Sequence, residues 1–255
     1  MSVLRLESRG RIRILRLDKG RGNAIDETLA EDLVRVTGEL AADESVHGVL
    51  LASAHASLFC PGLDLISLVE YDRASMERFI GKFAQALWSL YGLRKPVVAA
   101  VAGHAVAGGC VLALTADQRL LRRGGVQMGL AEVGLGVPLP WSVAVLLRAT
   151  LAPGSVPRVA LLGRNFSDQE AVAVGLADEL CEAEGFEETC LERLSCFAEK
   201  DSEALGRTKS YLRSSALAEM KAQEKDHVHE FLDGWFSEPT RERLHRTVAA
   251  LASRR

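Results

Sequence analysis

Two glycine-bearing turns, each following an apolar segment, constrain the fold of this chain more than any other feature. The apolar stretch 97–102 is typical of a buried strand, and it leads through the glycine-rich loop 103–109 into a short apolar helix at 109–116. The same order occurs earlier, where a strand at 47–52 precedes a small-residue loop that contains Gly62. Such strand ends place their loops on one side of a sheet, where α/β folds build their sites. We therefore predict an α/β fold with a site at these turns.

The nearly uncharged stretch 96–116 is long enough to raise the alternative of a membrane-spanning helix. Gly103, His104, Gly108 and Gly109 interrupt it, which favours a strand and a helix over a membrane span. The chain has 255 residues, of which 48% are apolar and 25% charged, as in ordinary globular proteins. Its net charge of −3 lacks the basic excess of a nucleic-acid-binding protein. We expect neither a membrane nor a nucleic acid as partner.

Periodicity and capping residues predict the remaining elements. Alternating apolar residues at 3–6 and 12–17, with Gly10 between them, indicate a hairpin. Asp26 is a good N-cap for the first helix, and Ser167 with Glu170 forms a capping box. From Pro140 onward we expect mainly helices, among them 186–199, 202–219, 222–234 and 239–252. This C-terminal part of the chain carries Phe231, Trp235 and Phe236, which either cover the first part of the chain or pack on another subunit.

The cysteine pattern and the lack of known phosphate-binding motifs limit the classes of protein to which this chain could belong. Five cysteines, an odd number without a C-x-x-C pair, indicate reduced thiols and a cytoplasmic location. Histidines, cysteines and acids do not cluster at metal-ligand spacing, so we expect no metal. The chain also lacks G-x-G-x-x-G and Walker sequences, which argues against a redox or hydrolytic nucleotide cofactor.

A single acid near the second turn indicates the chemistry. Glu132 lies in 129-GLAEVGLG-136 among apolar residues and glycines, so burial would raise its pKa toward the range of a general base. The alternative is a helix-capping or surface glutamate. The glycine loop offers backbone N–H groups but no side-chain acid, because residue 111 is valine. One acid beside amide donors suits the movement of a proton, whereas two acids would suit the addition of water.

Six segments in order resemble the crotonase (enoyl-CoA hydratase/isomerase) superfamily over essentially the whole chain. They are Gly22–Ile25, Phe59–Leu65, Lys95-Pro96, Gly103–Cys110, Gly129–Glu132 and 163–180. The resemblance implies a crotonase-like spiral of ββα units over residues 1–195 and a C-terminal helical trimerisation region at 196–255. It also implies an acyl-CoA thioester as substrate, no separate cofactor, and a homotrimer or hexamer.

The resemblance assigns roles to particular residues. The N–H groups of Leu63 and Gly108 correspond to the family's oxyanion hole, and Glu132 to its catalytic acid. Two fixed amide donors would stabilise the charge on the thioester oxygen when the α-carbon loses its proton. The residues that the resemblance places at the bound acyl-CoA are Arg21, Ala24, Cys60, Pro61, Gly62, Asp64 and Trp141.

Several of these residues also have plainer interpretations. Asp64 is better explained as a structural acid that caps a short helix, and Trp141 as packing or pocket wall rather than as a chemical group. Arg21, with Lys19, is either a solvated loop charge or a contact to the CoA phosphates. A nucleophilic thiol at Cys60, with His55 or His104 as base, is a further alternative.

Family hydratases carry a second glutamate where this chain has Val111, and a glycine-rich stretch where it has 137-VPLPW-141. The motifs FCPGLDL at 59–65, AGGCVLALTAD at 107–117 and MGLAEVGLG at 128–136 also most resemble the Δ3,Δ2-enoyl-CoA isomerases, which shift a 3-enoyl-CoA double bond to the trans-2 position. The alternatives are a hydratase or another thioester enzyme of the same fold, and a catalytically silent acyl-CoA-binding protein.

Overall fold

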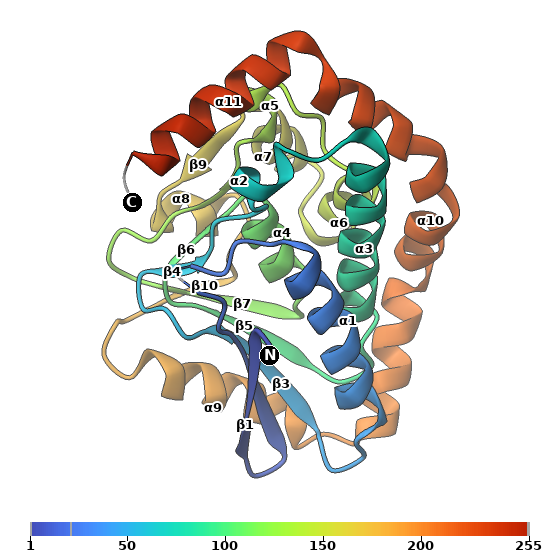
Figure 1. Ribbon diagram of the computed structural model, residues 1–255. Coiled ribbons are helices and arrows are strands. Elements are labelled where there is room, and N and C mark those ends of the chain that lie inside the picture. Colours follow the sequence, from blue (N-terminus) through green and yellow to red (C-terminus); the bar gives the residue numbers. More distant parts are fainter. Residues whose placement is uncertain (1, 21, 254–255) are drawn as a thin grey trace.

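The protein, seen here in a computed structural model that describes residues 2–20 and 22–253, is built on a six-stranded sheet (Figure 1). The sheet has the order β1-β2-β3-β5-β7-β10, in which only the β1–β2 pair is antiparallel. Its strands are β1 (Leu4–Arg9), β2 (Ile12–Leu17), β3 (Gly48–Ser53), β5 (Val97–Val101), β7 (Gln118–Arg122) and β10 (Glu179–Cys181). The hairpin predicted around Gly10 is the β1–β2 pair, and the glycine adopts the positive φ of 59° that its turn requires.

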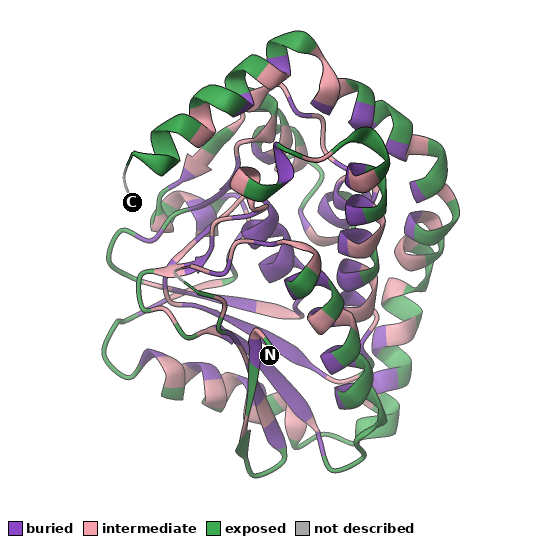
Figure 2. Ribbon diagram, in the orientation of Figure 1, coloured by how far each residue is buried: buried purple, intermediate pink, exposed green. Residues whose placement is uncertain are grey.

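Both faces of the central strands β3 and β5 are buried, which explains why these two strands read as continuous apolar runs. On β5, Val97, Ala99 and Val101 belong to the main core, whereas Val98 and Ala100 face a second apolar cluster. Helix α9 (Phe186–Ala198) covers that second cluster. Figure 2 shows buried residues along the sheet and exposed residues on the outer faces of the surrounding helices.

A second, smaller sheet sets the position of the predicted site. It has the order β4-β6-β8-β9 and consists of β4 (Leu58–Cys60), β6 (His104–Val106), β8 (Met128–Leu130) and β9 (Arg164–Phe166). The first three strands are parallel, so their carboxyl ends lie at one edge of the sheet. Gly62, Gly108 and Glu132 each follow one of these strands within two residues. The sheet thereby brings the two glycine turns and the acid to the same edge.

The remaining helices surround the two sheets. Those before the C-terminal region are α1 (Glu27–Ala42), α2 (Leu65–Leu68), α3 (Arg73–Tyr91), α4 (Gly108–Leu114), α5 (Glu132–Leu135), α6 (Trp141–Thr150), α7 (Val156–Leu161) and α8 (Asp168–Ala173). Two predicted caps are confirmed. Asp26 Oδ1 accepts from Leu29 N at 3.0 Å, and Ser167 and Glu170 form the reciprocal capping box. The chain beyond Pro140 is mainly helical, as expected, apart from the short strands β9 and β10.

The C-terminal region differs from the prediction in one respect. The two helices expected at 202–219 and 222–234 form one helix, α10 (Ser202–Phe236). The joining residues, 219-EMKA-222, are strong helix formers without glycine or proline, so the backbone continues through them. A final helix, α11 (Glu238–Ala252), begins at the predicted Ser-Glu-Pro sequence. The proposed domain boundary at 195/196 falls inside α9, and the division into two regions stays a prediction.

Helix α10 packs on α3 and α6 of the same chain, and α11 crosses α5 and α2 (Figure 1). Phe231 and Trp235 are consequently buried, and Phe236 is partly buried against the core. Of the two alternatives left open by the sequence, these residues cover the first part of their own chain.

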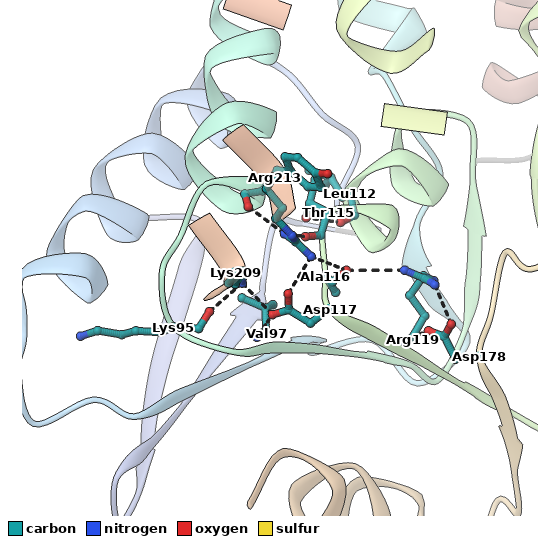
Figure 3. Close-up of polar contacts among 11 residues, drawn as sticks. Lys95, Val97, Leu112, Thr115, Ala116, Asp117, Arg119, Asp178, Lys209 and Arg213 are labelled. Atoms are coloured by element: carbon teal, nitrogen blue, oxygen red, sulfur yellow. Dashed lines mark hydrogen bonds and ion pairs between the residues drawn. The ribbon is translucent and has the colours of Figure 1, made fainter. Parts of the chain in front are cut away.

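A partly buried ionic network around Asp117 fastens α10 to the sheet (Figure 3). The carboxylate accepts from Val97 N at 2.7 Å and Lys209 Nζ at 2.6 Å, and lies 2.7 Å from Arg213 Nη2. Arg213 also donates to the carbonyl oxygen of Thr115 at 2.9 Å. Each charge has a partner and further hydrogen bonds, as buried charges require.

The apolar stretch 96–116 forms β5, β6 and α4 rather than one long helix. In the part of the chain that the structure describes, we find no helix with the length and apolarity needed to cross a membrane.

Candidate active site

The turns after β4 and β6 pack directly against each other. Gly62 has a φ of 95°, in the region that favours glycine, and a Cβ atom placed on it would lie 2.7 Å from Ala107 Cβ and 3.0 Å from Gly108 N. Ala107, which precedes α4, itself has a positive φ of 49°. Backbone strain of this kind is concentrated at functional sites. The two predicted loops therefore meet with their backbones in contact.

Two backbone N–H groups at this junction are left available. Ile25 N donates to Gly62 O and Asp64 N donates to Ile25 O, so the bridge between Ile25 and Leu63 does not use the Leu63 N–H. Gly108 is the first residue of α4, and the N–H groups of a helix's first turn have no partner within the helix. Among the backbone hydrogen bonds of the described turns, loops and helix caps, none has Leu63 N or Gly108 N as its donor. Both can therefore bind an oxygen atom of a ligand.

Glu132 begins α5, directly after the third parallel strand. Its Oε2 atom is buried, and among the described residues it has no hydrogen-bond partner. Burial raises the pKa of the Glu132 carboxyl from 4.5 to about 7, although hydrogen bonds from backbone N–H groups of Glu132 and Ala131 oppose this shift. A carboxyl with this pKa can exchange protons near neutral pH. The alternative of a surface or capping glutamate does not fit this environment.

A cavity of about 70 Å³ connects these groups. Pro61, Leu63, Ala107, Gly108 and Glu132 all belong to its wall. The other lining residues are apolar, namely Leu65, Phe83, Val111, Ala131, Leu135, Val137, Pro140, Val143, Phe231, Trp235 and Leu244. Glu132 is thus the only acid among the described residues of this wall. One acid and the two residues that carry the free amides thus lie in an otherwise apolar wall, a composition typical of sites that bind small organic ligands.

Val111 occupies this wall from the first turn of α4 and is 1% exposed. A side chain at position 111 therefore lies at the same cavity as Glu132, and here it is an aliphatic group that neither accepts nor donates a proton.

The C-terminal helices supply a part of the wall that the sequence analysis did not assign. Phe231 and Trp235 come from α10 and Leu244 from α11. The i, i+4 spacing of two large aromatic residues in a highly charged helix was the available indication of a buried face. Their contact with this cavity depends on how α10 and α11 pack against the rest of the chain, which the neighbouring sequence does not indicate.

Comparison with known proteins decides the family. A family model described as Enoyl-CoA hydratase/isomerase matches residues 7–243. The chain belongs to this family. Enoyl-CoA hydratase/isomerase proteins act on acyl-CoA thioesters, and the resemblance to the crotonase superfamily is confirmed.

Relatives within the family have different names. Enoyl-CoA delta isomerase 1, mitochondrial, from Homo sapiens is 29% identical over 212 residues, covering 82% of this chain and 70% of the relative. Carnitinyl-CoA dehydratase from Proteus mirabilis is 33% identical over 181 residues, covering 71% and 68%. The crystal structure of human mitochondrial Δ3-Δ2-enoyl-CoA isomerase covers 99% of both chains, with a TM-score of 0.94 and 24% identity. At that identity the structural likeness confirms the fold, a crotonase fold with a C-terminal helical region.

The enoyl-CoA hydratase/isomerase motif residues do not all lie at the cavity. Cys60 is fully buried and donates through Sγ to Asn23 O at 3.1 Å, and burial raises its pKa to about 12. A thiol in this state is a poor nucleophile. Its backbone carbonyl packs where Gly109 leaves room, since a Cβ atom there would lie 2.1 Å from Cys60 O. Cys60 therefore packs inside the turn, between the Asn23 loop and Gly109, and not at the cavity.

Asp64 and Trp141 lie beside the cavity and are not among its lining residues. Asp64 occupies the N-cap position of α2, but its carboxylate accepts from Ser67 Oγ at 3.0 Å instead of from a backbone amide. The Trp141 ring is stacked on His227, with ring centroids 3.8 Å apart. Of the segment 137-VPLPW-141, Val137 and Pro140 line the cavity, whereas Trp141 packs against α10.

The loop before α1 is held by Lys19, which donates to Ala24 O and forms an ion pair with Asp26, both at 2.7 Å. Ala24 is half-buried in this loop and is not a lining residue of the cavity. Arg21 lies outside the described residues, and its predicted contact with CoA phosphates stays a prediction.

The described residues contain no group of three or more histidines, cysteines or acids placed to hold a metal ion.

Proposed function

We propose that this protein is an enoyl-CoA isomerase that shifts the double bond of a 3-enoyl-CoA to the trans-2 position. The observation that carries the proposal is the pairing of one acid, Glu132, with an aliphatic residue, Val111, in the same cavity wall. Isomerisation needs one group that first removes and then returns a proton. A single carboxyl with a pKa of about 7 suits both steps.

In the proposed reaction, the ionised Glu132 carboxylate removes a proton from C2 of the 3-enoyl thioester. The C–H electron pair moves toward the thioester carbonyl, and a dienolate forms with negative charge on the oxygen. The protonated Glu132 then delivers the same proton to C4, the C2–C3 double bond forms, and the thioester carbonyl is restored. No atom is gained or lost, so neither water nor a redox cofactor enters the balance.

The Leu63 and Gly108 N–H groups are proposed to bind the thioester oxygen. Their charge-stabilising effect is greatest when the oxygen is most negative, which is in the dienolate-like transition state. Loss of one such donor typically lowers the rate about 10²- to 10³-fold. The apolar cavity strengthens these interactions because it limits competition from water.

The test is an isomerase assay with a 3-enoyl-CoA, following the trans-2-enoyl product. We expect turnover by the wild-type protein and a loss of about 10²- to 10⁴-fold in Glu132→Gln, which keeps the shape of the side chain but cannot accept the proton. Asp64→Asn is the matched control, because it also neutralises an acid near the turns but one outside the cavity. Activity that survives Glu132→Gln would disprove the proposed base.

Hydration of a trans-2-enoyl-CoA is the second candidate, favoured by relatives named carnitinyl-CoA dehydratase and short-chain-enoyl-CoA hydratase. Val111 argues against it, because hydration needs one group for the water and another for the α-proton. Efficient hydration by the wild-type protein would reverse the order of the two candidates. A silent acyl-CoA-binding protein would bind the thioester and turn over neither substrate.

The proposal includes two further expectations. The family resemblance implies a homotrimer or hexamer, which sedimentation velocity would measure. The cysteine pattern indicates a cytoplasmic location, which fractionation would measure.

A further inference from the structure

The helical turn that carries Glu132 has little packing of its own. Helix α5 is a single turn, and none of its four residues is buried as a whole, although the Glu132 Oε2 atom is. Val133, the next residue, is 44% exposed. A single turn fixes several backbone dihedral angles for few hydrogen bonds, so it needs support from outside. Because Glu132 is the proposed base, the contacts that hold this turn bear on the reaction.

One peptide unit links this turn to α11. The peptide between Gly136 and Val137 donates through Val137 N to Glu132 O at 3.0 Å. The carbonyl oxygen of the same unit, Gly136 O, accepts from Thr240 Oγ1 at 2.9 Å. Because a peptide unit is planar, the two hydrogen bonds act through one rigid group. The Thr240 hydroxyl is thus connected to the backbone of Glu132 by two hydrogen bonds in series.

Thr240 is held closely against this peptide. It lies in the first turn of α11 and is 2% exposed. Gly136 ends α5 with a φ of 82°, and a Cβ atom on it would lie 2.8 Å from Thr240 Oγ1 and 2.6 Å from Arg243 Nη1. The glycine therefore permits both the turn and the close approach of α11. One turn after Thr240, Leu244 lines the cavity, so one face of α11 reaches both the cavity and the turn that carries the base.

We infer that Thr240 is a positioning residue, which holds Glu132 in the cavity wall through the peptide between Gly136 and Val137. The inference rests on the proposed function, because it takes Glu132 to be the group that moves the proton. Thr240 is not among the lining residues of the cavity, so its effect on the reaction passes through the backbone of Glu132. Proton transfer depends on the distance from the carboxylate to the reacting carbon, and a displacement of about 1 Å can lower the rate about 100-fold.

The first experiment compares the steady-state kinetics of Thr240 variants with those of the wild type, using a 3-enoyl-CoA. Thr240→Val keeps the shape of the side chain and removes the hydroxyl. We expect kcat to fall about 10- to 100-fold while KM changes less than about 3-fold. KM should change little because the Leu63 and Gly108 amides, proposed to bind the thioester, lie on other loops. Thr240→Ser keeps the hydroxyl and should retain a kcat near that of the wild type.

Thr247→Val is the matched control, because it makes the same substitution in the same helix. Thr247 Oγ1 donates to Arg243 O of α11 itself, at 2.9 Å, and has no link to α5 through that bond. We expect this variant to retain the wild-type kcat. If Thr240→Val does not fold, Thr240→Cys is the second variant, since a thiol fits a similar space but donates only weakly. Its kcat should fall below that of Thr240→Ser.

The second experiment titrates the Glu132 carboxyl and needs no turnover. The ¹³Cδ shift of labelled glutamate, assigned with Glu132→Gln, follows its ionisation. Burial raises the pKa of Glu132 to about 7 from 4.5, and a displaced turn admits water, so the midpoint should move down in Thr240→Val but not in Thr247→Val. Two nearby groups keep their state from pH 5 to pH 8. Cys110 of α4 has a pKa raised to about 12, and Arg243 of α11, like other arginines, stays charged.

A wild-type kcat or an unmoved Glu132 midpoint in Thr240→Val would refute the inference, even if its Tm fell. An equal loss of kcat in Thr240→Ser would also refute it, because the hydroxyl would then not be the group that matters. Failure of the proposed reaction gives a different result. If the wild type lacks isomerase activity while the midpoint still moves in Thr240→Val alone, the reaction is contradicted and the positioning of Glu132 by Thr240 stands.

Discussion

The carboxylate of Glu224, in the middle of α10, accepts two hydrogen bonds from Ser142 at the start of α6. Its Oε2 atom lies 2.8 Å from Ser142 N and 2.5 Å from Ser142 Oγ. Pro140, at the N-cap position of α6, makes no side-chain cap, so Glu224 caps this helix from a distant part of the chain. Because Pro140 and Val137 line the cavity just before α6, the contact also fixes the cavity wall to α10.

We expect Glu224→Ala to destabilise the protein by about 2–4 kcal/mol, because it leaves two buried donors of Ser142 unpaired and creates a cavity. Glu224→Gln should cost less than about 1 kcal/mol, since its amide oxygen can accept both hydrogen bonds. Burial raises the pKa of Glu224, so removal of its charge offsets part of any loss. Urea unfolding at pH 7 measures both variants. Equal losses would show that the negative charge itself is required.

The pKa of Glu132 predicts the pH dependence of activity. A base must be ionised, and the carboxyl has a pKa of about 7, so kcat/KM should rise with pH and level off above about pH 8. The profile should have an apparent pKa of about 7, well above the 4.5 of an ordinary glutamate. A profile that is flat from pH 5 to pH 8 would contradict either the burial of Glu132 or its role as the base.

The same shift predicts a stability change in Glu132→Gln. The folded-state pKa of about 7 lies above the ordinary 4.5, so the folded protein retains a proton that the unfolded chain has lost. The wild-type free energy of unfolding should therefore fall between pH 4.5 and pH 7, because the carboxyl of the unfolded chain is ionised there while the buried carboxyl is still protonated. Glu132→Gln lacks this loss and should have a higher Tm than wild type at pH 8, with a smaller difference at pH 5. Thermal unfolding at the two pH values measures the effect.

Lys209 shows the opposite linkage. Burial lowers its pKa from 10.5 to about 8, against the opposing effect of Asp117, so the unfolded chain binds more protons between these values. The free energy of unfolding should rise with pH in this window, by up to about 1.4 kcal/mol per pH unit. Lys209→Met should flatten this rise relative to wild type. Denaturant unfolding from pH 7 to pH 10 measures the difference, and parallel curves for the two proteins would contradict it.

The sequence predicted those parts of the fold whose determinants are local. Asp26 caps its helix and the Ser167–Glu170 box forms, because each depends on residues within three positions. The second sheet was not predicted, since three-residue strands such as β4 and β6 are too short to show an alternating pattern. The break expected near residue 220 was wrong because no local helix terminator supports it.

The residues of the site also fall into those that local motifs predicted and those that long-range packing brings to the cavity. Glu132, Leu63 and Gly108 were assigned from motifs that resemble a family, and the structure places all three at one cavity. Trp235 and Leu244 were missed, because their contact with the cavity follows from long-range packing of α10 and α11. Trp141 was assigned to ligand binding, but it stacks on His227, because the start of α6 turns the ring toward α10. Contacts between distant helices are the part of a site that motifs do not record.

Val111 offers the most direct test of the choice between isomerisation and hydration. Val111→Glu places a second carboxyl in the wall that contains Glu132. Like charges in a low-dielectric cavity raise each other's pKa, so the isomerase pH profile should move up by about one unit or more. Val111→Gln, of similar size but uncharged, should leave the midpoint unchanged. The two carboxyls could also activate water, and Val111→Glu should then hydrate trans-2-enoyl-CoA more rapidly than wild type. An unchanged pH midpoint in Val111→Glu would mean that residue 111 does not interact with the base, and the argument from its side chain would fail.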